Sequence, residues 1–408
     1  MDKKILDSYA DLIVKAGANV QKGQYVVIRT NPCCEEFAAL VAKKCYEAGA
    51  KQVFVHWISS SLNKVDYQYA AEEQLSTVLP FEEACHKFMA DNNPVLIWLD
   101  SDDPDGLKGV DAQKVATVKS NKFKVLAKYR EAQQNKAQWT IAGVPSKEWA
   151  MKVFPKLTEA DAIEALWKAI LTTARCLDGN GIANWDKHEV DLKKRCAYLN
   201  SLKLAKLHYQ SKTGTDFTVG LIPGVIFLGG GEKDLPGHFF QPNIPSEECF
   251  TSPMKGKAEG LVVASKPLVY QGQMIEDFTV RFHEGKAVEV TAKKGLEVLK
   301  SILTLDKGSA YLGECALVPF NSPINQTGLL FFNTLYDENA ACHLALGEGF
   351  TELYPNYEKY TDEEVRSFGI NKSISHVDFM IGDQYLNITG TTVDGNEVAI
   401  FRNGAWAF

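Results

Sequence analysis

Short apolar segments alternate with helical patterns over the first half of the chain, and this alternation constrains the fold more than any other feature of the sequence. Nearly continuous apolar strands that alternate with helices are typical of a parallel sheet covered on both faces. The pattern therefore predicts a doubly wound, flavodoxin-like α/β domain at residues 1–185. We expect its strands at residues 25–30, 52–58, 94–100 and 138–144, with helices at 5–16 and 35–48.

The loops of this domain lack the motif of a dinucleotide site. Residues 30–34 follow the first strand and contain no glycine, whereas a dinucleotide-binding loop needs Gly-x-Gly-x-x-Gly. Asp100, Asp102, Asp103 and Asp105 follow the third strand, where either a binding loop or a solvated acidic turn could lie. The N-terminal half therefore offers a scaffold but no recognisable catalytic motif.

From Leu204 onward the segments become short, rich in strand-forming residues and punctuated by glycine. One helical pattern, at residues 296–305, interrupts them. Such a succession predicts an α+β domain built on a large mixed or antiparallel sheet. We place this domain at residues 186–408 and expect strands at residues 206–211, 217–221, 225–228, 260–264, 274–282 and 287–291.

Composition narrows the setting in which the protein works. The net charge of -7 argues against a nucleic-acid partner, which would require a basic surface. No apolar run reaches the ~20 residues of a membrane span, and residues 1–7 lack the apolar core of a signal peptide. The nine cysteines lack framework spacing, which indicates free thiols in a reducing compartment. We therefore expect a cytoplasmic protein that binds neither nucleic acid nor membrane.

His376 and Asp378 stand two positions apart in the apolar stretch 376–381. Residues i and i+2 of a strand project from the same face, so this imidazole and this carboxylate would point at one spot. Such a pair can bind a divalent cation such as zinc, cobalt or manganese. The alternative is a half-buried strand with two unrelated polar side chains.

Three other segments of the C-terminal half carry side chains of the same kind, namely Glu248, Glu314 and His343. Glu314 stands in an apolar strand, where an uncompensated carboxylate is costly. Each residue also has an ordinary alternative: a loop carboxylate, one half of a buried ion pair, and a core histidine. Together with His376 and Asp378 they supply five oxygen and nitrogen ligands, too many for one closed tetrahedral zinc site. The set suits two metal ions that share one or two carboxylates.

A cysteine adjoins each of these three residues, at positions 249, 315 and 342. Neighbouring side chains of a strand point to opposite faces. We therefore expect the thiols of Cys249, Cys315 and Cys342 to face away from the metal ions and to pack in the core.

Four blocks of the C-terminal half have a familiar order and spacing. They are Asn-Ile-Pro-Ser-Glu-Glu-x-Phe-Thr-Ser-Pro at 243–253, Gly-Glu at 313–314, His-Leu-Ala-Leu-Gly at 343–347, and Asn-x-Ser-x-x-His-Val-Asp-Phe-Met-Ile-Gly at 371–382. In these blocks the chain resembles the thermophilic metalloaminopeptidase family, typified by aminopeptidase T, aminopeptidase S and PepS. The resemblance covers essentially the whole chain, and the last block is its most specific part.

The resemblance implies an exopeptidase that removes N-terminal residues from peptides, with water activated by two divalent metal ions. Carried over by position, the implied metal ligands are Glu248, Glu314, His343, His376 and Asp378. The implied ions are zinc, cobalt, manganese or magnesium. The family also implies a homodimer with peptides as substrates.

Glu247 and Phe350 are the two positions near these blocks whose roles stay open. Glu247 is a candidate general base, and a solvated loop carboxylate is the alternative. Many members of the family carry a tyrosine seven positions after the ligand histidine, where this chain has Phe350. If that hydroxyl stabilises the tetrahedral intermediate, its loss would lower the rate by ~10²–10³. Tyr354, Tyr357, Tyr360 or Glu348 could substitute for it.

Two other functions would use the same ligands. A dinuclear hydrolase of another ester class, such as phosphoesters, would need basic residues near the metal ions, and the ligand segments contain few. A weakly active or non-catalytic metal-binding relative is the other alternative, and Phe350 is the feature that favours it.

Overall fold

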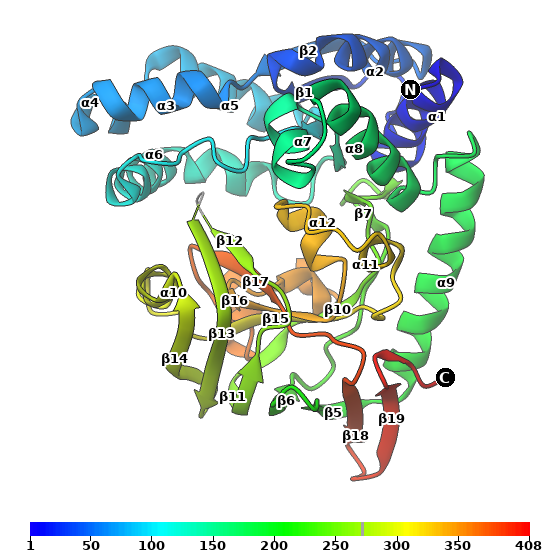
Figure 1. Ribbon diagram of the computed structural model, residues 1–408, viewed down its shortest axis with the longest axis vertical. Helices are drawn as coiled ribbons and strands as arrows, with labels where there is room; N and C mark the ends of the chain where they lie inside the picture. The colour runs from blue at the N-terminus through cyan, green and yellow to red at the C-terminus, as the bar shows by residue number, and fades with distance from the viewer. Residues whose placement is uncertain (271–272) are drawn as a thin grey trace. The chain divides into compact units, whose positions relative to one another are not determined.

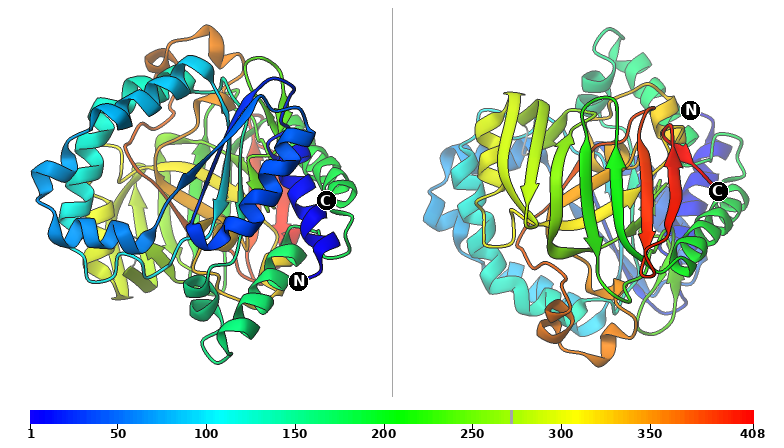
Figure 2. Two further views of the ribbon diagram at one scale, coloured as in Figure 1. Left: turned by 90° about the horizontal axis from the view of Figure 1, so that it is seen from above. Right: turned by 90° about the horizontal axis from the view of Figure 1, so that it is seen from below.

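The strands expected in the N-terminal half form one parallel sheet, so the predicted α/β architecture is confirmed. The computed structural model describes residues 1–270 and 273–408. The strand order is β2-β1-β3-β4-β9, that of a doubly wound sheet, and the left view of Figure 2 shows these strands from above. The strands are β1 (Tyr25–Thr30), β2 (Gln52–Trp57), β3 (Val95–Asp100), β4 (Trp139–Gly143) and β9 (Asn243–Ile244).

Several of the helices around this sheet begin at residues whose side-chain oxygens cap them. Asp2, Asp111, Ser146 and Thr158 each accept a hydrogen bond from a backbone N–H of the first turn. Gly49 follows α2 with φ +96°, a conformation that ends a helix at little cost when the residue is glycine. The helices are α1 (Lys3–Asp11), η1 (Leu12–Gly17), η2 (Pro32–Cys34), α2 (Glu35–Glu47), α3 (Ser60–Tyr69), α4 (Glu72–Ser76), α5 (Pro80–Asn92), α6 (Ala112–Gln133), α7 (Lys147–Val153), α8 (Glu159–Thr173) and α9 (Gly181–Ser201).

The chain divides into two compact units. The first comprises Met1–Lys187 and Gly231–Pro245, and the second comprises His188–Gly230 and Ser246–Phe408. Residues 231–245 belong to the first unit because β9 extends the parallel sheet, where the Ile141 N–H donates to the Pro242 carbonyl at 2.7 Å. The segment also holds the short hairpin of β7 (Glu232–Lys233) and β8 (Phe239–Phe240). That residues 1–185 and 186–408 fold as separate domains stays a prediction.

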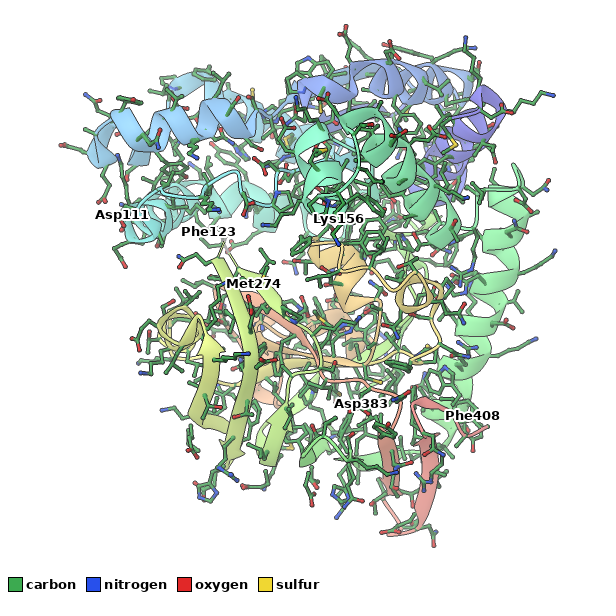
Figure 3. All side chains as sticks on the ribbon, viewed as in Figure 1. Asp111, Phe123, Lys156, Met274, Asp383 and Phe408 are labelled. Carbon is green, nitrogen blue, oxygen red and sulfur yellow. The ribbon has the colours of Figure 1, made fainter. Side chains whose placement is uncertain are left out.

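The larger sheet of the second unit is antiparallel throughout, with nine strands among the described residues. Its order is β12-β13-β11-β6-β5-β18-β19-β20, with β14 paired to β13, as the right view of Figure 2 shows. Asp383, labelled in Figure 3, precedes β18 and accepts hydrogen bonds from the Ser211 and Thr213 hydroxyls at 2.6 and 2.7 Å. The strands are β5 (Leu204–Gln210), β6 (Asp216–Leu221), β11 (Pro253–Val263), β12 (Leu268–Tyr270), β13 (Gln273–His283), β14 (Lys286–Lys294), β18 (Asn387–Thr392), β19 (Glu397–Arg402) and β20 (Ala405–Trp406).

One expected strand is absent from this part of the described chain. Residues 225–228 form no strand, and Leu228 makes a single bridge to Phe250. Two features explain the difference: Pro223 has no backbone N–H to donate, and Gly224 has φ +84°, which turns the chain away from an extended path. The apolar composition of the segment instead serves packing, since Phe227 lies in the hydrophobic core.

A smaller antiparallel sheet of four strands packs against the larger one. Its order is β10-β15-β16-β17, and these strands lie together in Figure 1. One hydrophobic core contains Leu207 and Val280 of the large sheet together with Leu344 of the small sheet, and the rings of Phe278 and Phe379 lie 5.9 Å apart. The strands are β10 (Cys249–Thr251), β15 (Leu312–Leu317), β16 (His343–Gly347) and β17 (His376–Met380).

Short helices connect the strands of the second unit. The helix expected at residues 296–305 is present as α10 and ends at Ile302. None of the helices within the described ranges is both long enough and apolar enough to cross a bilayer. The helices are α10 (Leu296–Ile302), α11 (Pro323–Gln326), α12 (Thr334–Glu338), η3 (Thr351–Leu353), η4 (Tyr357–Lys359) and α13 (Asp362–Ser367).

Candidate metal centre

The two faces of the four-stranded sheet differ in chemistry. Leu344 and Phe379 belong to the hydrophobic core on one face. Glu314 and Asp378 stand opposite Ala345, one on each neighbouring strand, so their side chains share the other face. Successive side chains of a strand point to opposite faces, so the apolar residues lie on one face of this sheet and the ligand-type residues on the other. The spacing of His376 and Asp378 predicts this arrangement.

A β-bulge at Gly313 places Glu314 on the ligand face. Leu312 pairs with Leu346 and Glu314 pairs with Ala345, so two steps along β15 match one step along β16. Without the bulge, Leu312 and Glu314 would share a face; with it, Leu312 enters the core while Glu314 does not. A Cβ at Gly313 would lie 1.9 Å from the carbonyl oxygen of Glu348, so the bulge requires glycine.

The five ligands predicted from the sequence converge in two clusters that share Glu314. One cluster contains Glu248, Glu314 and His343, and the other contains Glu314, His376 and Asp378; within each, ligand atoms lie within 4.8 Å of one another. His376 Nε2 lies 3.1 Å from a carboxylate oxygen of Glu314 and 3.1 Å from one of Asp378. His343 Nε2 lies 3.2 Å from a carboxylate oxygen of Glu248.

Backbone carbonyls orient both histidines. His376 Nδ1 lies 2.8 Å from the carbonyl oxygen of Glu348, and His343 Nδ1 lies 3.2 Å from that of Ala341. Because a carbonyl oxygen can only accept, each Nδ1 carries the proton and donates it. Each Nε2 is thereby turned towards the carboxylates, which is the arrangement of metal-ligating histidines.

The two clusters bring several carboxylates close together in a buried environment, and this shifts the pKa values of the groups. Burial raises the pKa of Glu314 to about 7, although the His376 imidazole opposes this shift. Burial alone would lower the pKa of His343, but Glu248, Glu314 and Asp378 raise it to about 10. Burial would likewise lower the pKa of His376, and Asp378 and Glu314 raise it well above its usual value. The site thus attracts positive charge strongly.

Glu338 is a further carboxylate beside the two clusters, and the sequence did not indicate it. Burial, followed by the charges of Asp378, Glu248 and Glu314, raises the pKa of Glu338 well above its usual value, so its carboxyl belongs to the same acidic group. A hydrogen bond between Asp378 and Glu338 joins it to the second cluster. The pair Asp337-Glu338 lies on the five-residue helix α12, where the sequence resembles an ordinary solvated acidic turn, and no spacing rule connects it to the other ligands.

Glu247 faces a different environment from its neighbour Glu248. Its side chain is buried, and its carboxylate lies 3.8 Å from His188 Nε2 on α9, so it is not a solvated loop carboxylate. Neither of the two ligand clusters found among the described residues contains it. The role of Glu247 as general base stays a prediction.

The three cysteines next to the ligands lie where strand alternation places them. Cys249, Cys315 and Cys342 are free, fully buried and part of the hydrophobic core. Burial raises the pKa of the Cys315 thiol, which disfavours the thiolate that a metal ion would require. A metal ion held by either cluster would therefore have oxygen and nitrogen ligands.

Phe350 lies at the edge of the second cluster, with its ring centroid 5.0 Å from that of His376. Tyr354 stacks on Phe368 at 4.4 Å, in a separate apolar cluster that Tyr357 also joins. The carboxylate of Glu348 is engaged by Arg366 and by the Ser373 N–H. These residues have structural contacts of their own, and whether one of them takes the place of a hydroxyl at position 350 stays a prediction.

Known proteins resemble this chain over its whole length. The family described as thermophilic metalloprotease (M29) matches residues 2–406. Aminopeptidase AmpS of Bacillus subtilis strain 168 is 42% identical over 404 residues, 99% of this chain and 98% of that protein. Aminopeptidase T of Thermus thermophilus is 36% identical over 408 residues, again 99% and 98%. The solved structure of wild-type AmpT from Thermus thermophilus matches with a TM-score of 0.91 and 35% identity, covering 100% of both chains.

Proposed function

We propose that this chain, which belongs to the M29 family of thermophilic metalloproteases, is a metal-dependent aminopeptidase that releases the N-terminal residues of peptides. Its relatives in Bacillus subtilis and Thermus thermophilus carry the name aminopeptidase. The observation that carries the proposal is the sharing of Glu314 by two ligand clusters. A carboxylate that belongs to both clusters could hold two divalent cations at once, and such pairs of ions catalyse hydrolysis.

Charge balance supports two divalent cations. Glu248, Glu314, Glu338 and Asp378 bring four carboxylates to one buried place, and His343 and His376 are the imidazoles beside them. Two imidazolium groups would neutralise half of that negative charge, whereas two divalent cations would neutralise all of it. Since uncompensated buried charge is costly, the ligand set fits a pair of cations.

Ligand chemistry supports the assignment of each cluster. We assign one ion to Glu248, Glu314 and His343, and the other to Glu314, His376 and Asp378, with Glu338 as a further carboxylate beside them. Atoms bonded at ~2.0–2.2 Å to one ion lie no more than about 4.4 Å apart, close to the spacing within each cluster. Mixed carboxylate and imidazole ligands suit zinc, cobalt, manganese or magnesium.

The protein's own groups position the reaction. When bound, a pair of divalent cations lowers the pKa of a water molecule and polarises the carbonyl of the bond to be cleaved. The strands of the small sheet fix Glu314, His343 and Asp378 on a rigid face, and the two Nδ1 hydrogen bonds hold the imidazoles. The apolar residues beneath the sheet keep the ligand groups from bulk water, which strengthens their electrostatic effect.

Hydrolysis of leucine p-nitroanilide, with and without a chelator, tests the proposal. We expect release of p-nitroaniline that the chelator abolishes and that added cobalt or zinc restores. The Nα-acetylated substrate is the control, because an aminopeptidase requires a free amino group. Turnover that survives metal removal, or equal turnover of the acetylated substrate, would contradict the proposal; bis-p-nitrophenyl phosphate tests the phosphoesterase alternative.

An exposed apolar stripe on α3 supports a homodimer. Leu62, Val65 and Tyr69 follow one another at helical spacing and are 66%, 48% and 83% exposed, and none of the α3 residues is buried. Exposed apolar stripes of this kind mark interaction sites. We expect Tyr69→Lys to shift the mass measured by light scattering from dimer towards monomer, whereas Tyr360→Lys in the second unit leaves it unchanged. A dimer that persists in both variants would show that the α3 stripe is not the dimer interface.

The state of the cysteines supports a cytoplasmic location. Cysteines 34, 45, 176, 196, 249, 315 and 342 are free and buried, and 33 and 85 are free and exposed. Unpaired thiols of this number suit a reducing compartment. Activity recovered in the cytosolic fraction of the source cells would support this location, and activity confined to the medium would contradict it.

A further inference from the structure

We infer that the neighbouring thiols of Cys33 and Cys34 form a binding site for one trivalent arsenical, which both sulfurs would bind at once. The inference concerns the first unit alone and is independent of the proposed aminopeptidase function. The two residues end η2 and directly precede α2. Both thiols are free; Cys33 is exposed and Cys34 is buried.

The two thiols lie in the part of the fold where doubly wound sheets bind their ligands. In the sheet, β1 stands between β2 and β3, so the strand order changes direction at β1. Ligands of such folds bind outside the carboxyl ends of the strands at this switch point. Residues 31–34 follow the carboxyl end of β1. The position therefore favours a ligand site, and the exposed thiol of Cys33 makes it accessible.

The separation of the two sulfurs fits a ligand atom bound by both. The Sγ atoms of Cys33 and Cys34 lie 3.7 Å apart. A soft centre bonded to two thiolate sulfurs at ~2.3 Å holds them about 3.8 Å apart at a tetrahedral angle, and somewhat closer at the narrower angle of pyramidal arsenic. A small rotation of the exposed Cys33 side chain supplies this adjustment. The pair is therefore largely preorganised for two-point binding.

A disulfide between the two cysteines would compete poorly with such a ligand. Disulfide-bonded residues usually have Cα atoms roughly 4.4–6.8 Å apart. Consecutive Cα atoms across a trans peptide bond are only about 3.8 Å apart, and the bond between Cys33 and Cys34 is trans. A direct S–S bond would strain the turn before α2, so the pair stays available as a dithiol.

The surroundings favour one thiolate within the pair. A hydrogen bond from the Cys33 thiol lowers the pKa of Cys34, and the Ser101 hydroxyl adds to this effect, while burial and the Asp100 carboxylate oppose it. The same hydrogen bond raises the pKa of Cys33. The thiolate is the form of cysteine that binds soft centres. The pair therefore presents one thiolate beside one exposed thiol.

Binding of an arsenical is a condensation in which nothing is oxidised or reduced. With phenylarsine oxide, two As–S bonds form, while the bond between arsenic and oxygen and the two S–H bonds break. The oxygen and the two protons leave as one water molecule, and arsenic stays trivalent. Because the second As–S bond forms within one molecule, attachment through two sulfurs is about 10²–10⁴-fold stronger than attachment through one.

Titration of the full-length protein with phenylarsine oxide tests the inference. Intact mass measurement counts the bound arsenicals, and reaction with a thiol reagent after unfolding counts the thiols that they occupy. Cys33→Ser removes one sulfur at an exposed position, and Cys34→Ala removes the other. Cys85→Ser is the matched control, because Cys85 is an exposed free cysteine outside the pair.

The parent should bind one arsenical per chain, lose two titratable thiols and be restored by ethanedithiol but not by an equal concentration of 2-mercaptoethanol. Cys33→Ser and Cys34→Ala should each weaken binding by at least about 10²-fold. Cys85→Ser should bind as the parent does. Binding of parent strength in Cys33→Ser, its loss in Cys85→Ser, or its absence from the parent would overturn the inference. Peptide hydrolysis does not enter this test, so either outcome leaves the proposed function unaffected.

Discussion

The two ligand clusters share Glu314 yet differ in how they meet solvent. The side chain of His343 is 1% exposed, and that of His376 is 26% exposed. Asp378 of the second cluster also lines a small cavity, together with Glu338. A catalytic metal site keeps one position open, whereas a structural one is closed. From this difference we expect the His343 cluster to anchor the bound metal and the His376 cluster to meet the substrate.

The clusters also differ in what holds their histidines. The His343 ring is held by the carbonyl of Ala341, just before its own strand. The His376 ring is held by the carbonyl of Glu348, whose carboxylate is bound by Arg366 and by the Ser373 N–H. The closed cluster therefore depends on the sheet, and the open cluster depends on a polar network outside it.

The largest expected effect comes from the residue that both clusters share. Glu314→Gln keeps the shape of the side chain but removes the bridging charge, so both ions should bind weakly. We expect kcat/KM to fall by at least about 10³-fold, more than the ~10–100-fold typical of a group that only supports a ligand. The measurement is peptide hydrolysis together with metal content.

The matched control for this change is Glu297→Gln, since Glu297 is exposed on α10 and its carboxylate pairs with Lys300. It should keep the parent activity and metal content. If Glu314→Gln retained more than about a tenth of the parent activity, the two clusters would not work as one site.

A gain of activity is expected from Phe350→Tyr, which alters the open cluster alone. The ring of Phe350 lies beside His376, so an added hydroxyl would lie near the reacting groups. A donor to the developing oxyanion contributes ~10²–10³ in kcat. We expect kcat to rise by up to about 10²-fold with little change in KM. Phe368→Tyr, in the separate apolar cluster, should produce no gain. A fall or no change in kcat for Phe350→Tyr would exclude a role for the hydroxyl here.

A smaller effect is expected from Arg366→Ala, which weakens the network behind His376. The guanidinium also donates to the Asn371 carbonyl and to Asp362, each at 2.8 Å. Its loss should lower the affinity for one of the two ions by ~10–100-fold and leave the other unchanged, with kcat of the fully loaded enzyme largely retained. Arg366→Lys should restore little, because the planar fork is lost. Titration with a chelator measures both affinities, with Arg281→Ala on β13 as control. Equal weakening of both sites would contradict the comparison.

The smallest effect concerns Asp306, which holds the segment before β17. Burial would raise the pKa of this carboxyl, but hydrogen bonds from the Ile374 N–H, the Ser373 hydroxyl and two further N–H groups lower it overall. A lowered folded-state pKa stabilises the fold above the unfolded pKa of ~3.9, and this contribution is lost as the pH falls through the folded value. Asp306→Asn should therefore cost roughly 1 kcal/mol of unfolding free energy at pH 7 and less once the pH has fallen through the folded-state pKa. A difference that stays constant with pH would contradict this account.

Regular periodicity made much of the site predictable. The spacing of His376 and Asp378 placed both on one face of β17, and the same rule placed Cys315 in the core. The apolar surroundings of Glu314 indicated a buried carboxylate in need of a positive partner. In the first unit, the alternation of strands and helices gave the four long parallel strands, since continuous apolar runs are the signature of a sheet covered on both faces.

What the sequence did not reveal depends on contacts between distant residues. The β9 strand joins a parallel sheet nearly 100 residues after β4, and no local pattern records this pairing. The bulge at Gly313 depends on the approach of the Glu348 carbonyl, and Glu338 joins the site through the fold of α12. The segment 225–228 has the composition of a strand but has no partner strand that would complete a ladder within the described part of the chain.

Metal stoichiometry tests the central claim most directly. The protein is freed of metal, titrated with cobalt and followed by both elemental analysis and peptide hydrolysis. The account predicts that two ions bind to each chain and that activity reaches its plateau only at the second equivalent. A plateau at one equivalent, or hydrolysis in the metal-free protein, would contradict a centre in which Glu314 joins two cations.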